Sequence, residues 1–243
     1  IVVLMLPKAF SNGGYLVSVV LDALRQSVPH PDPVSVTTHF LRPGTANEPC
    51  AVRVAVIRTG RSLSTVRGTL SQSGKDRIEV LAAFSDLSQP AGIDAPITLI
   101  APTIPGPDDC VARTGGMQGV ELPITRSMDI RLHPELANPD GAGKAEVAGW
   151  IRFRDGREPD VRSLIAFADA FPPSPLGLLG AVGWVPTIEL TVHIRRRPAA
   201  GWIQAHFRTD DLKDGLMIES GALWDADGQL VAQSRQLGLV LAR

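Results

Sequence analysis

The apolar stretch Tyr15-Leu-Val-Ser-Val-Val-Leu-Asp22-Ala-Leu24 sets the architecture of this chain, because its pattern returns as Ser163-Leu-Ile-Ala-Phe-Ala-Asp169-Ala-Phe171. Both stretches are apolar around nearly the whole circumference of a helix, which is typical of a helix buried on all sides. Each carries one acid near its end, so Asp22 corresponds to Asp169. A repeat in the rest of the chain is therefore expected, and it would change how every other segment is interpreted.

A strand-like run follows each of these helices after a turn that contains proline. The runs are Pro33-Val-Ser-Val-Thr-Thr-His39-Phe-Leu-Arg42-Pro43 and Thr187-Ile-Glu-Leu-Thr-Val-His193-Ile-Arg-Arg196-Arg197, with His39 154 residues before His193. Further on, Arg67-Gly68-Thr-Leu70 and Ser220-Gly221-Ala-Leu223 each end a β segment before a polar turn, at an offset of 153. Two nearly equal offsets indicate a duplicated unit of one buried helix and several strands.

One buried helix followed by several long antiparallel strands is typical of α+β packing in which a sheet curls around the helix, the hotdog arrangement. The sequence therefore predicts a double (tandem) hotdog. A doubly wound parallel sheet would need helices that alternate with strands, and only one convincing helix is found in each half. The motifs G-x-S-x-G, G-x-G-x-x-G and the Walker loop do not occur, which argues against the commonest serine hydrolase and nucleotide-binding folds.

The repeat predicts three parts of the chain. Residues 1–87 are expected to form the N-terminal hotdog, residues 88–120 a linker rich in Pro and Gly, and residues 121–243 the C-terminal hotdog. The second unit should begin with strands over residues 128–133 and 145–154, joined by the turn Asn138-Pro-Asp-Gly141. Because fewer residues precede the first helix than the second, we expect the first unit to lack its first strand, although residues 1–6 have a strand pattern.

The composition argues against several classes of function. With 24 basic and 25 acidic residues the net charge is −1, so no overall field attracts nucleic acid or an anionic membrane. Cys50 and Cys110 are far apart and the five histidines form no i, i+4 pair, so neither a metal site, a disulfide framework nor a cofactor is expected. No apolar stretch reaches the roughly 20 residues of a membrane span. We expect a cytoplasmic protein.

Four short segments resemble the acyl-CoA thioesterase II family: Asn12-Gly13-Gly14-Tyr15, Phe167-Ala-Asp169, Thr187-Ile-Glu189 and Val231-Ala-Gln-Ser-Arg-Gln236. The resemblance covers nearly the whole chain. In that family two fused hotdogs form a pseudo-dimer, and an Asp, a Thr and a Gln of the second hotdog position a water molecule against the thioester carbonyl. The resemblance implies an acyl-CoA substrate and catalytic roles for Asp169, Thr187 and Gln236. One departure is Asn12, where hotdog relatives often have His.

These three residue types suit the implied chemistry. A carboxylate on an apolar helix, such as Asp169, needs hydrogen-bond partners, and in a partly dry pocket it can take a proton from water. The alternative is an acid near the end of its helix that reaches solvent or caps the turn before Pro172-Pro173. An inward-facing amide such as Gln236 needs a protein group, a water molecule or a ligand as partner. Thr187 alone is an ordinary strand residue, so only the combination points to hydrolysis.

Substrate-binding residues are expected at two places. Arg195-Arg196-Arg197 is the densest basic run, so Arg195 and Arg196 would hold the phosphates of CoA, unless the run is only a solvated strand end. Asn12-Gly13-Gly14 would offer backbone N–H groups at a helix start to a thioester oxygen or a phosphate. The alternative is that it only caps the helix. Gly13 and Gly14 are therefore candidate binding positions as well.

Two rival functions remain open. A hotdog hydratase or dehydratase would need a His beside the acid, and neither helix contains Asp-x4-His. A hotdog protein that binds acyl-CoA without turnover fits the same residues. The repeat offsets place Thr187 on Pro33 or Val34 and Gln236 on Ala83, so only the second copy is expected to hydrolyse. A homo-oligomer is also expected, because sheet edges of such units commonly pair.

Overall fold

A computed structural model describes residues 2–5, 13–89, 92–114, 116–117, 119, 123–137 and 143–241 of the chain. Within these residues, twelve strands form one sheet in the order β1-β3-β4-β5-β2-β9-β12-β11-β10-β8-β7-β6. All neighbouring strands are antiparallel. The turn expected at residues 138–141 and the expected start of the second unit at Glu121 lie outside the described residues.

The first half of the sheet surrounds one long helix, α1 (Gly13–Arg25). Its strands are β1 (Val2–Met5), β2 (Asp32–Phe40), β3 (Pro49–Thr59), β4 (Ser64–Gln72) and β5 (Lys75–Ser85). Leu16, Val20 and Leu24 of α1 are at most 2% exposed. Because these positions recur every four residues, they form one apolar face that packs on the sheet.

The second half repeats this arrangement around the shorter helix α2 (Val161–Ala168). Its strands are β6 (Val111–Ala112), β7 (Met128–Leu132), β8 (Glu146–Phe153), β9 (Thr187–Ile194), β10 (Ile203–Lys213), β11 (Leu216–Trp224) and β12 (Leu230–Leu239). Three short turns of helix cover Pro107–Asp109, Pro123–Arg126 and Leu176–Leu179, the last of which is α3. Helix α2 ends at Ala168 rather than at the expected Phe171, because Pro172 and Pro173 disfavour helix just before them.

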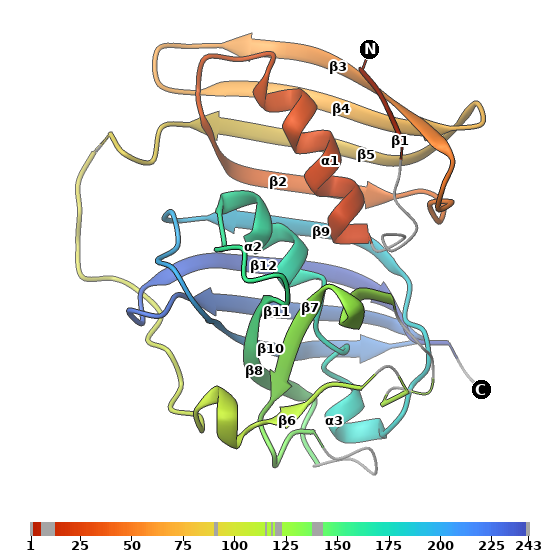
Figure 1. The fold of residues 1–243 in the computed structure, drawn as a ribbon, viewed down its shortest axis with the longest axis vertical. Helices are drawn as coiled ribbons and strands as arrows, with labels where there is room; N and C mark the ends of the chain where they lie inside the picture. The colour runs from red at the N-terminus through yellow and green to blue at the C-terminus, as the bar shows by residue number, and fades with distance from the viewer. Residues whose placement is uncertain are drawn as a thin grey trace.

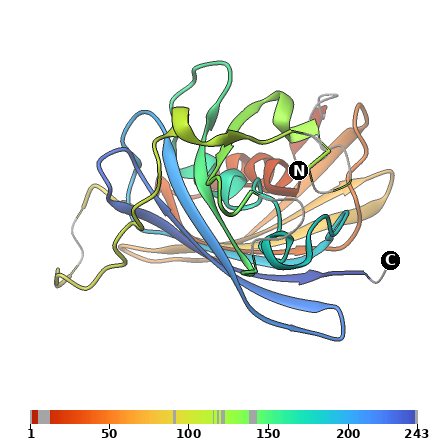
Figure 2. The ribbon, with the colours of Figure 1, turned by 90° about the horizontal axis from the view of Figure 1, so that it is seen from below.

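Figure 1 shows the two halves as one continuous sheet with α1 and α2 next to each other, and Figure 2 shows both helices on the same concave face. The main hydrophobic core runs through both halves and includes Leu24 and Phe84 from the first and Phe167 and Phe207 from the second. The predicted double hotdog is therefore confirmed. None of the helices in the described part of the chain has the length and apolarity that a membrane span requires.

The two halves meet along the antiparallel pair of β2 and β9. Ser35 pairs with His193 and His39 pairs with Glu189, so Thr37 and Thr191 stand opposite each other at the centre. Their side-chain oxygens are 2.9 Å apart and share a hydrogen bond. Thr37 and Thr191 are 154 residues apart in the sequence, which is the repeat offset. An approximate twofold axis therefore passes between these two threonines, and we call this pair of strands the seam.

At the outer edges, the halves differ. Strand β1 pairs with β3 as β8 pairs with β10, so β1 occupies the position that corresponds to β8. Strand β7 continues the second half beyond β8. Within the described residues, no strand of the first half corresponds to β7.

The segment between the halves was expected to be a linker. Residues 99–105 of this segment are bound to the sheet. Three side chains of the sheet donate to its carbonyl oxygens: Trp224 to Leu99 at 3.0 Å, Gln204 to Pro102 at 2.6 Å and Trp150 to Pro105 at 2.8 Å. The three donors are register partners across β11, β10 and β8. Contacts at every third residue match the period of a polyproline II helix. The chain then continues through β6, so this segment becomes part of the second half.

Candidate active site

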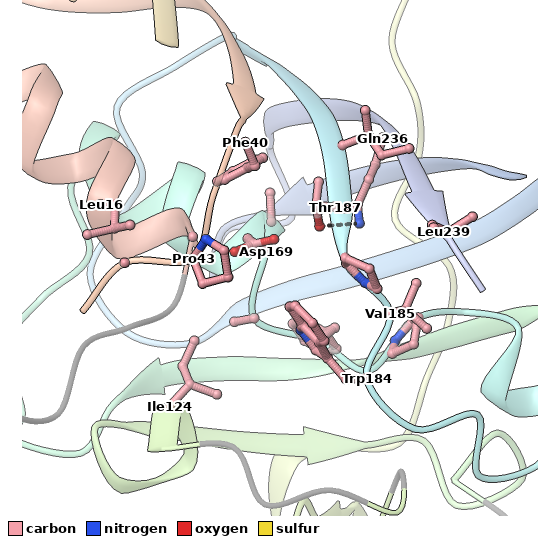
Figure 3. Close-up of a pocket in the computed structure, with 18 of the residues that line it drawn as sticks. Leu16, Phe40, Pro43, Ile124, Asp169, Trp184, Val185, Thr187, Gln236 and Leu239 are labelled. Carbon is pink, nitrogen blue, oxygen red and sulfur yellow. Dashed lines mark hydrogen bonds between the residues drawn. The ribbon is translucent and has the colours of Figure 1, made fainter. Parts of the chain in front are cut away.

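A cavity of about 490 Å³ lies between the halves, where the start of α1 meets the end of α2. Figure 3 shows its labelled side chains: Leu16, Phe40 and Pro43 come from the first half, and Asp169, Thr187 and Gln236 from the second. The three predicted catalytic residues therefore face one cavity, although they are separated by up to 67 residues of sequence. Apolar groups form much of the remaining wall.

Thr187 and Gln236 are held together by a hydrogen bond. The Gln236 side-chain amide donates to Thr187 Oγ1 at 2.9 Å, as the dashed line in Figure 3 shows. The register of β9 against β12 shifts at Ile188, so that Thr187 pairs with Gly238. Without this bulge, alternation would place Thr187 on the same face of the sheet as Glu189. The bulge thus turns the Thr187 side chain toward the helices, which is a common use of β-bulges beside functional sites.

Asp169 takes the C-cap position of α2 and is half-buried. Its Oδ2 accepts a hydrogen bond of 2.7 Å from the backbone N–H of Gly14 in the first turn of α1. The start of a helix carries partial positive charge, which stabilises a carboxylate there. The first half therefore holds the acid of the second half in place.

Gly13 and Gly14 allow α1 to approach this carboxylate closely. A Cβ on Gly13 would lie 2.5 Å from the ring of Phe40 and 3.1 Å from Asp169 Oδ2. A Cβ on Gly14 would lie 2.9 Å from the backbone of Ala166. The expectation that the Gly14 N–H is available to substrate is therefore corrected, because that N–H binds Asp169. Gly13 lines the cavity, and a role for it in substrate binding stays a prediction.

Arg195 and Arg196 lie far from this cavity. Thr187 begins β9 and Arg195 follows its last residue, so at about 3.3 Å per residue the two are roughly 25 Å apart. Both arginines are exposed, and neither lines the cavity. The expectation that they bind the phosphates of CoA at this site is therefore not supported by the geometry. The arginines that do line the cavity are Arg42 and Arg113.

Two charged residues of the site were missed in the sequence. Glu219 on β11 is 6% exposed and is the register partner of Gln236. Burial raises the pKa of its carboxyl, hydrogen bonds from Ser174 oppose that rise, and the charge of Asp169 adds to it. Arg113 follows β6 and is 5% exposed, and its side chain donates to the carbonyl oxygen of Ala170. Glu219 could have been identified in the sequence as the lone acid in an otherwise largely apolar strand. No comparable sequence feature pointed to Arg113.

One exposed part of the cavity wall is aromatic. Trp184 lines it and leaves 55% of its surface exposed. It lies in the segment between α3 and β9, where Gly180 and Gly183 both have positive φ angles of 73° and 77°. Such angles favour glycine, so this loop can place a large indole at the entrance. An exposed aromatic ring at a cavity mouth is a suitable contact for a ligand that carries apolar groups.

A second cavity, of about 670 Å³, lies where the end of α1 meets the start of α2. It is the counterpart of the first cavity under the twofold relation of the seam, and Asp22 and Pro33 line it. The bulge recurs, because Pro33 pairs with Phe84 across a register shift at Val34. Counted from that bulge, Gln236 corresponds to Ala82 instead of the expected Ala83.

Comparison with known proteins agrees with this architecture. A model of the acyl-CoA thioesterase N-terminal domain matches residues 6–86, and a model of the acyl-CoA thioesterase C-terminal domain matches residues 107–240. The fold and the two matching models thus define a tandem hotdog of the thioesterase class. Because the C-terminal model alone covers more than half of the chain, the chain belongs to the acyl-CoA thioesterase family, and the predicted resemblance is confirmed.

Solved structures cover almost the whole chain. A candidate thioesterase II from Thermobifida fusca is 28% identical, with a TM-score of 0.87 over 99% of this chain and 92% of its own. An acyl-CoA thioesterase II from Mycobacterium marinum is 26% identical, with a TM-score of 0.73 over 95% of this chain and 89% of its own. A hot dog fold protein of unknown function from Alicyclobacillus acidocaldarius is 22% identical, with a TM-score of 0.86 over 99% of this chain and 93% of its own. The last supports the fold alone.

Proposed function

We propose that the protein hydrolyses an acyl-CoA thioester to a free acid and CoA by direct attack of water, with Asp169 as general base. One observation carries the proposal: the carboxylate of Asp169 and the hydrogen-bonded pair of Thr187 and Gln236 face a single cavity. These groups can orient a water molecule and accept its proton without forming a covalent intermediate. The acyl-CoA thioesterase family of this chain supplies the substrate class.

The proposed reaction has two steps. The oxygen of a bound water attacks the thioester carbonyl carbon while Asp169 takes one of its protons, which leaves a tetrahedral intermediate with a negative oxygen. The intermediate then re-forms its C=O bond and expels CoA as a thiolate, which takes up the proton. A thiolate is a good leaving group, so hydrolysis at neutral pH does not require a separate strong acid.

The Thr187 and Gln236 pair would position the water. The Thr187 oxygen accepts one N–H from Gln236, which directs the threonine hydroxyl hydrogen away from the amide and toward another acceptor. An amide carries two N–H donors, so the second N–H of Gln236 would bind the water or the developing oxyanion. Groups fixed in this way reduce the reorganisation that the transition state requires.

The walls of the cavity suit the acyl group. Leu16 and Ile124 are at most 4% exposed and Phe40 packs against the core, so these three would surround an acyl chain. Arg42 lies at the exposed side of the same cavity, where it would meet an anionic part of CoA. This placement replaces the pair Arg195 and Arg196 as the expected cationic contact.

The alternatives differ in what the cavity would have to contain. A hydratase or dehydratase of the hotdog type would need a histidine beside the acid, and none of the five histidines, all in the described part of the chain, lines this cavity. A protein that only binds acyl-CoA would need no carboxylate that faces the same cavity as a hydrogen-bonded Thr and Gln. A cytoplasmic location and a homo-oligomeric state stay predictions.

The test is incubation of the protein with saturated acyl-CoAs of graded chain length and a chromogenic thiol reagent. We expect CoA to be released in proportion to protein concentration. Asp169→Asn protein, purified in the same way, is the control for contaminating thioesterases. Binding of acyl-CoA by both proteins without release of CoA from any chain length would refute hydrolysis and favour the binding protein.

A further inference from the structure

We propose that Arg113 and Glu219 are positioning residues that clamp the turn 169–174 from both ends and so fix the carboxylate of Asp169. The inference rests on the proposed function, because it assigns to these residues a role in that reaction. Both are buried, and both come from outside the helix that carries the acid. Neither one contributes an atom to the proposed reaction.

Arg113 holds the beginning of the turn. Its guanidinium donates to the carbonyl oxygen of Ala170, the residue after Asp169. The backbone N–H of Arg113 donates to the carbonyl oxygen of Ile130 on β7 at 2.9 Å, which ties Arg113 to the edge of the sheet. Burial lowers the pKa of Arg113 to about 10, and the charge of Asp169 opposes this shift. The guanidinium therefore stays charged at neutral pH, close enough to Asp169 for the two charges to interact.

Glu219 holds the end of the turn. Its Oε2 accepts the backbone N–H of Ser174 at 2.7 Å, and the Ser174 hydroxyl shares a hydrogen bond of 2.7 Å with Thr209 Oγ1. Thr209 is the register partner of Glu219 on β10, so both contacts come from neighbouring strands. Ser174 is fully buried. The turn is thereby fixed to the sheet at Ser174, as it is fixed to Arg113 at Ala170.

The turn needs such support because α2 ends at Ala168 and does not extend through it. Pro172 and Pro173 donate no backbone hydrogen bond, so the middle of the turn cannot stabilise itself through a helical ladder. A carboxylate that must accept a proton from one oriented water tolerates little displacement. The counterpart of Glu219 in the first half is Val66, which pairs with Ala82 as Glu219 pairs with Gln236. The clamp at Glu219 thus belongs to the second copy.

The first experiment replaces Arg113 and follows the pH profile of kcat/KM. Loss of a nearby positive charge disfavours the ionised carboxylate, so Arg113→Met should move the acidic limb upward by about one pH unit. The same variant should lower kcat about tenfold with little change in KM, because the base is displaced while the apolar residues that would surround the acyl chain remain. Arg113→Lys keeps the charge and should restore the acidic limb.

Arg131→Met is the matched control. Arg131 lies on β7, opposite Ala112 of β6, and its side chain pairs with Asp129 outside the cavity. It should retain the wild-type pH profile. If folded Arg113→Met protein has the wild-type kcat and acidic limb, Arg113 has no positioning role and the proposal fails for it.

The second experiment separates positioning from chemistry at Glu219 and stays informative if Arg113→Met does not fold. Glu219→Gln keeps an oxygen that can accept the Ser174 N–H, so its kcat should remain within about threefold of wild type. Glu219→Leu removes the acceptor and should lower kcat about tenfold at unchanged KM. If both variants match wild type, the clamp is unnecessary. If both are equally damaged while folded, the carboxyl acts in the reaction itself and the positioning role is refuted.

A readout without turnover distinguishes failure of this inference from failure of the proposed function. The ¹³C carboxyl resonance of Asp169, assigned by its loss in Asp169→Asn, reports the titration of this residue in the resting protein. It should titrate at higher pH in Arg113→Met than in wild type. An unchanged titration refutes the inference even if the enzyme hydrolyses acyl-CoA. Absence of CoA release with a shifted titration refutes the proposed function alone.

Discussion

The two copies of the hotdog each place an acid near the end of their helix and give it different partners. In the second copy, Asp169 accepts the backbone N–H of Gly14 at the start of α1. In the first copy, Asp22 binds the guanidinium of Arg162 at the start of α2. Each contact lies where the end of one helix meets the start of the other, at the two places that the twofold relation of the seam exchanges. The comparison shows that the partners of an acid, more than its place in the fold, determine what it can do.

The start of α2 is capped by an acid of its own. Asp160 caps this helix and accepts hydrogen bonds from the backbone N–H groups of Arg162 and Ser163 at 3.1 and 2.8 Å. The Arg162 side chain also binds Asp160, at 2.7 Å. The partner of Asp22 is the charged side chain of Arg162. The counterparts of Thr187 and Gln236 in the first copy are Pro33 and Ala82. The second cavity, which Asp22 lines, therefore has an acid without the counterparts of Thr187 and Gln236.

The largest expected effect is that of Asp169→Asn. The substitution removes the basic oxygen, and loss of a positioned general base should lower kcat by about a hundredfold or more. The asparagine side-chain oxygen can still accept the Gly14 N–H, so the melting temperature should change little. The measurement is CoA release in single turnover at saturating acyl-CoA. A variant with more than half of the wild-type rate and unchanged melting would show that the base has been assigned wrongly.

Thr187→Ala and Gln236→Ala should come next. Each loses one of the two groups that hold the water, and a reduction in kcat of about tenfold to a hundredfold is expected. Because the two side chains bind each other, the double variant should lose less than the product of the single losses. Thr191→Ala, on the same strand outside the cavity, is the control and should match wild type. If the loss in kcat of the double variant equals the product of the two single losses, the pair does not act as a unit.

Asp160→Ala should lower stability without lowering kcat, since it removes the cap of α2. Burial acts to raise the pKa of Asp160, but hydrogen bonds from Arg162 and Ser163 outweigh it and hold the pKa below its ordinary value. A lowered carboxyl pKa stabilises the fold above the ordinary value near 4, and this contribution is lost as pH falls further. Urea unfolding should show a loss of about 1 kcal/mol at pH 7. A difference that does not shrink below pH 4 would contradict this explanation.

The smallest effect is expected for Asp22→Asn. The acid takes no part in the proposed reaction, so kcat should stay within about threefold of wild type. The side chains of Arg162 and Asp22 are 42% and 49% exposed, so loss of their ion pair should cost less than about 1 kcal/mol of stability. Turnover and urea unfolding measured on the same preparation test both statements. If Asp22→Asn proves as damaging as Gln236→Ala while folded, the first copy takes part in the reaction.

Patterns that repeat along the chain were enough to predict the fold. The two apolar helices and the strand-like runs after them are local patterns, and their recurrence at an offset of 153 or 154 residues can be read directly from the sequence. The inward direction of Thr187 was not predictable in this way, because it depends on a bulge in the pairing with β12. A strict alternation would have placed this side chain on the outer face, beside Glu189.

Long-range contacts account for the rest of what the sequence did not reveal. Gly14 looked like a donor to substrate until the structure showed Asp169 within reach of it, 155 residues away. Arg113 lay in a segment that composition marks as a connector, and only folding brings it to Ala170. Arg195 and Arg196 attracted attention by their density of charge, but a sequence does not show which end of a strand faces the cavity.

The seam has a consequence for how the two copies can diverge. Thr37 and Thr191 are joined by backbone pairing of their strands and by one shared hydrogen bond. At the seam, each copy therefore contacts a strand that resembles its own. In an assembly of two identical chains, every substitution would occur twice and would alter both cavities together. In this single chain a substitution occurs once. The cavity with Pro33 and the cavity with Thr187 can therefore change independently, while the strands that join them stay alike.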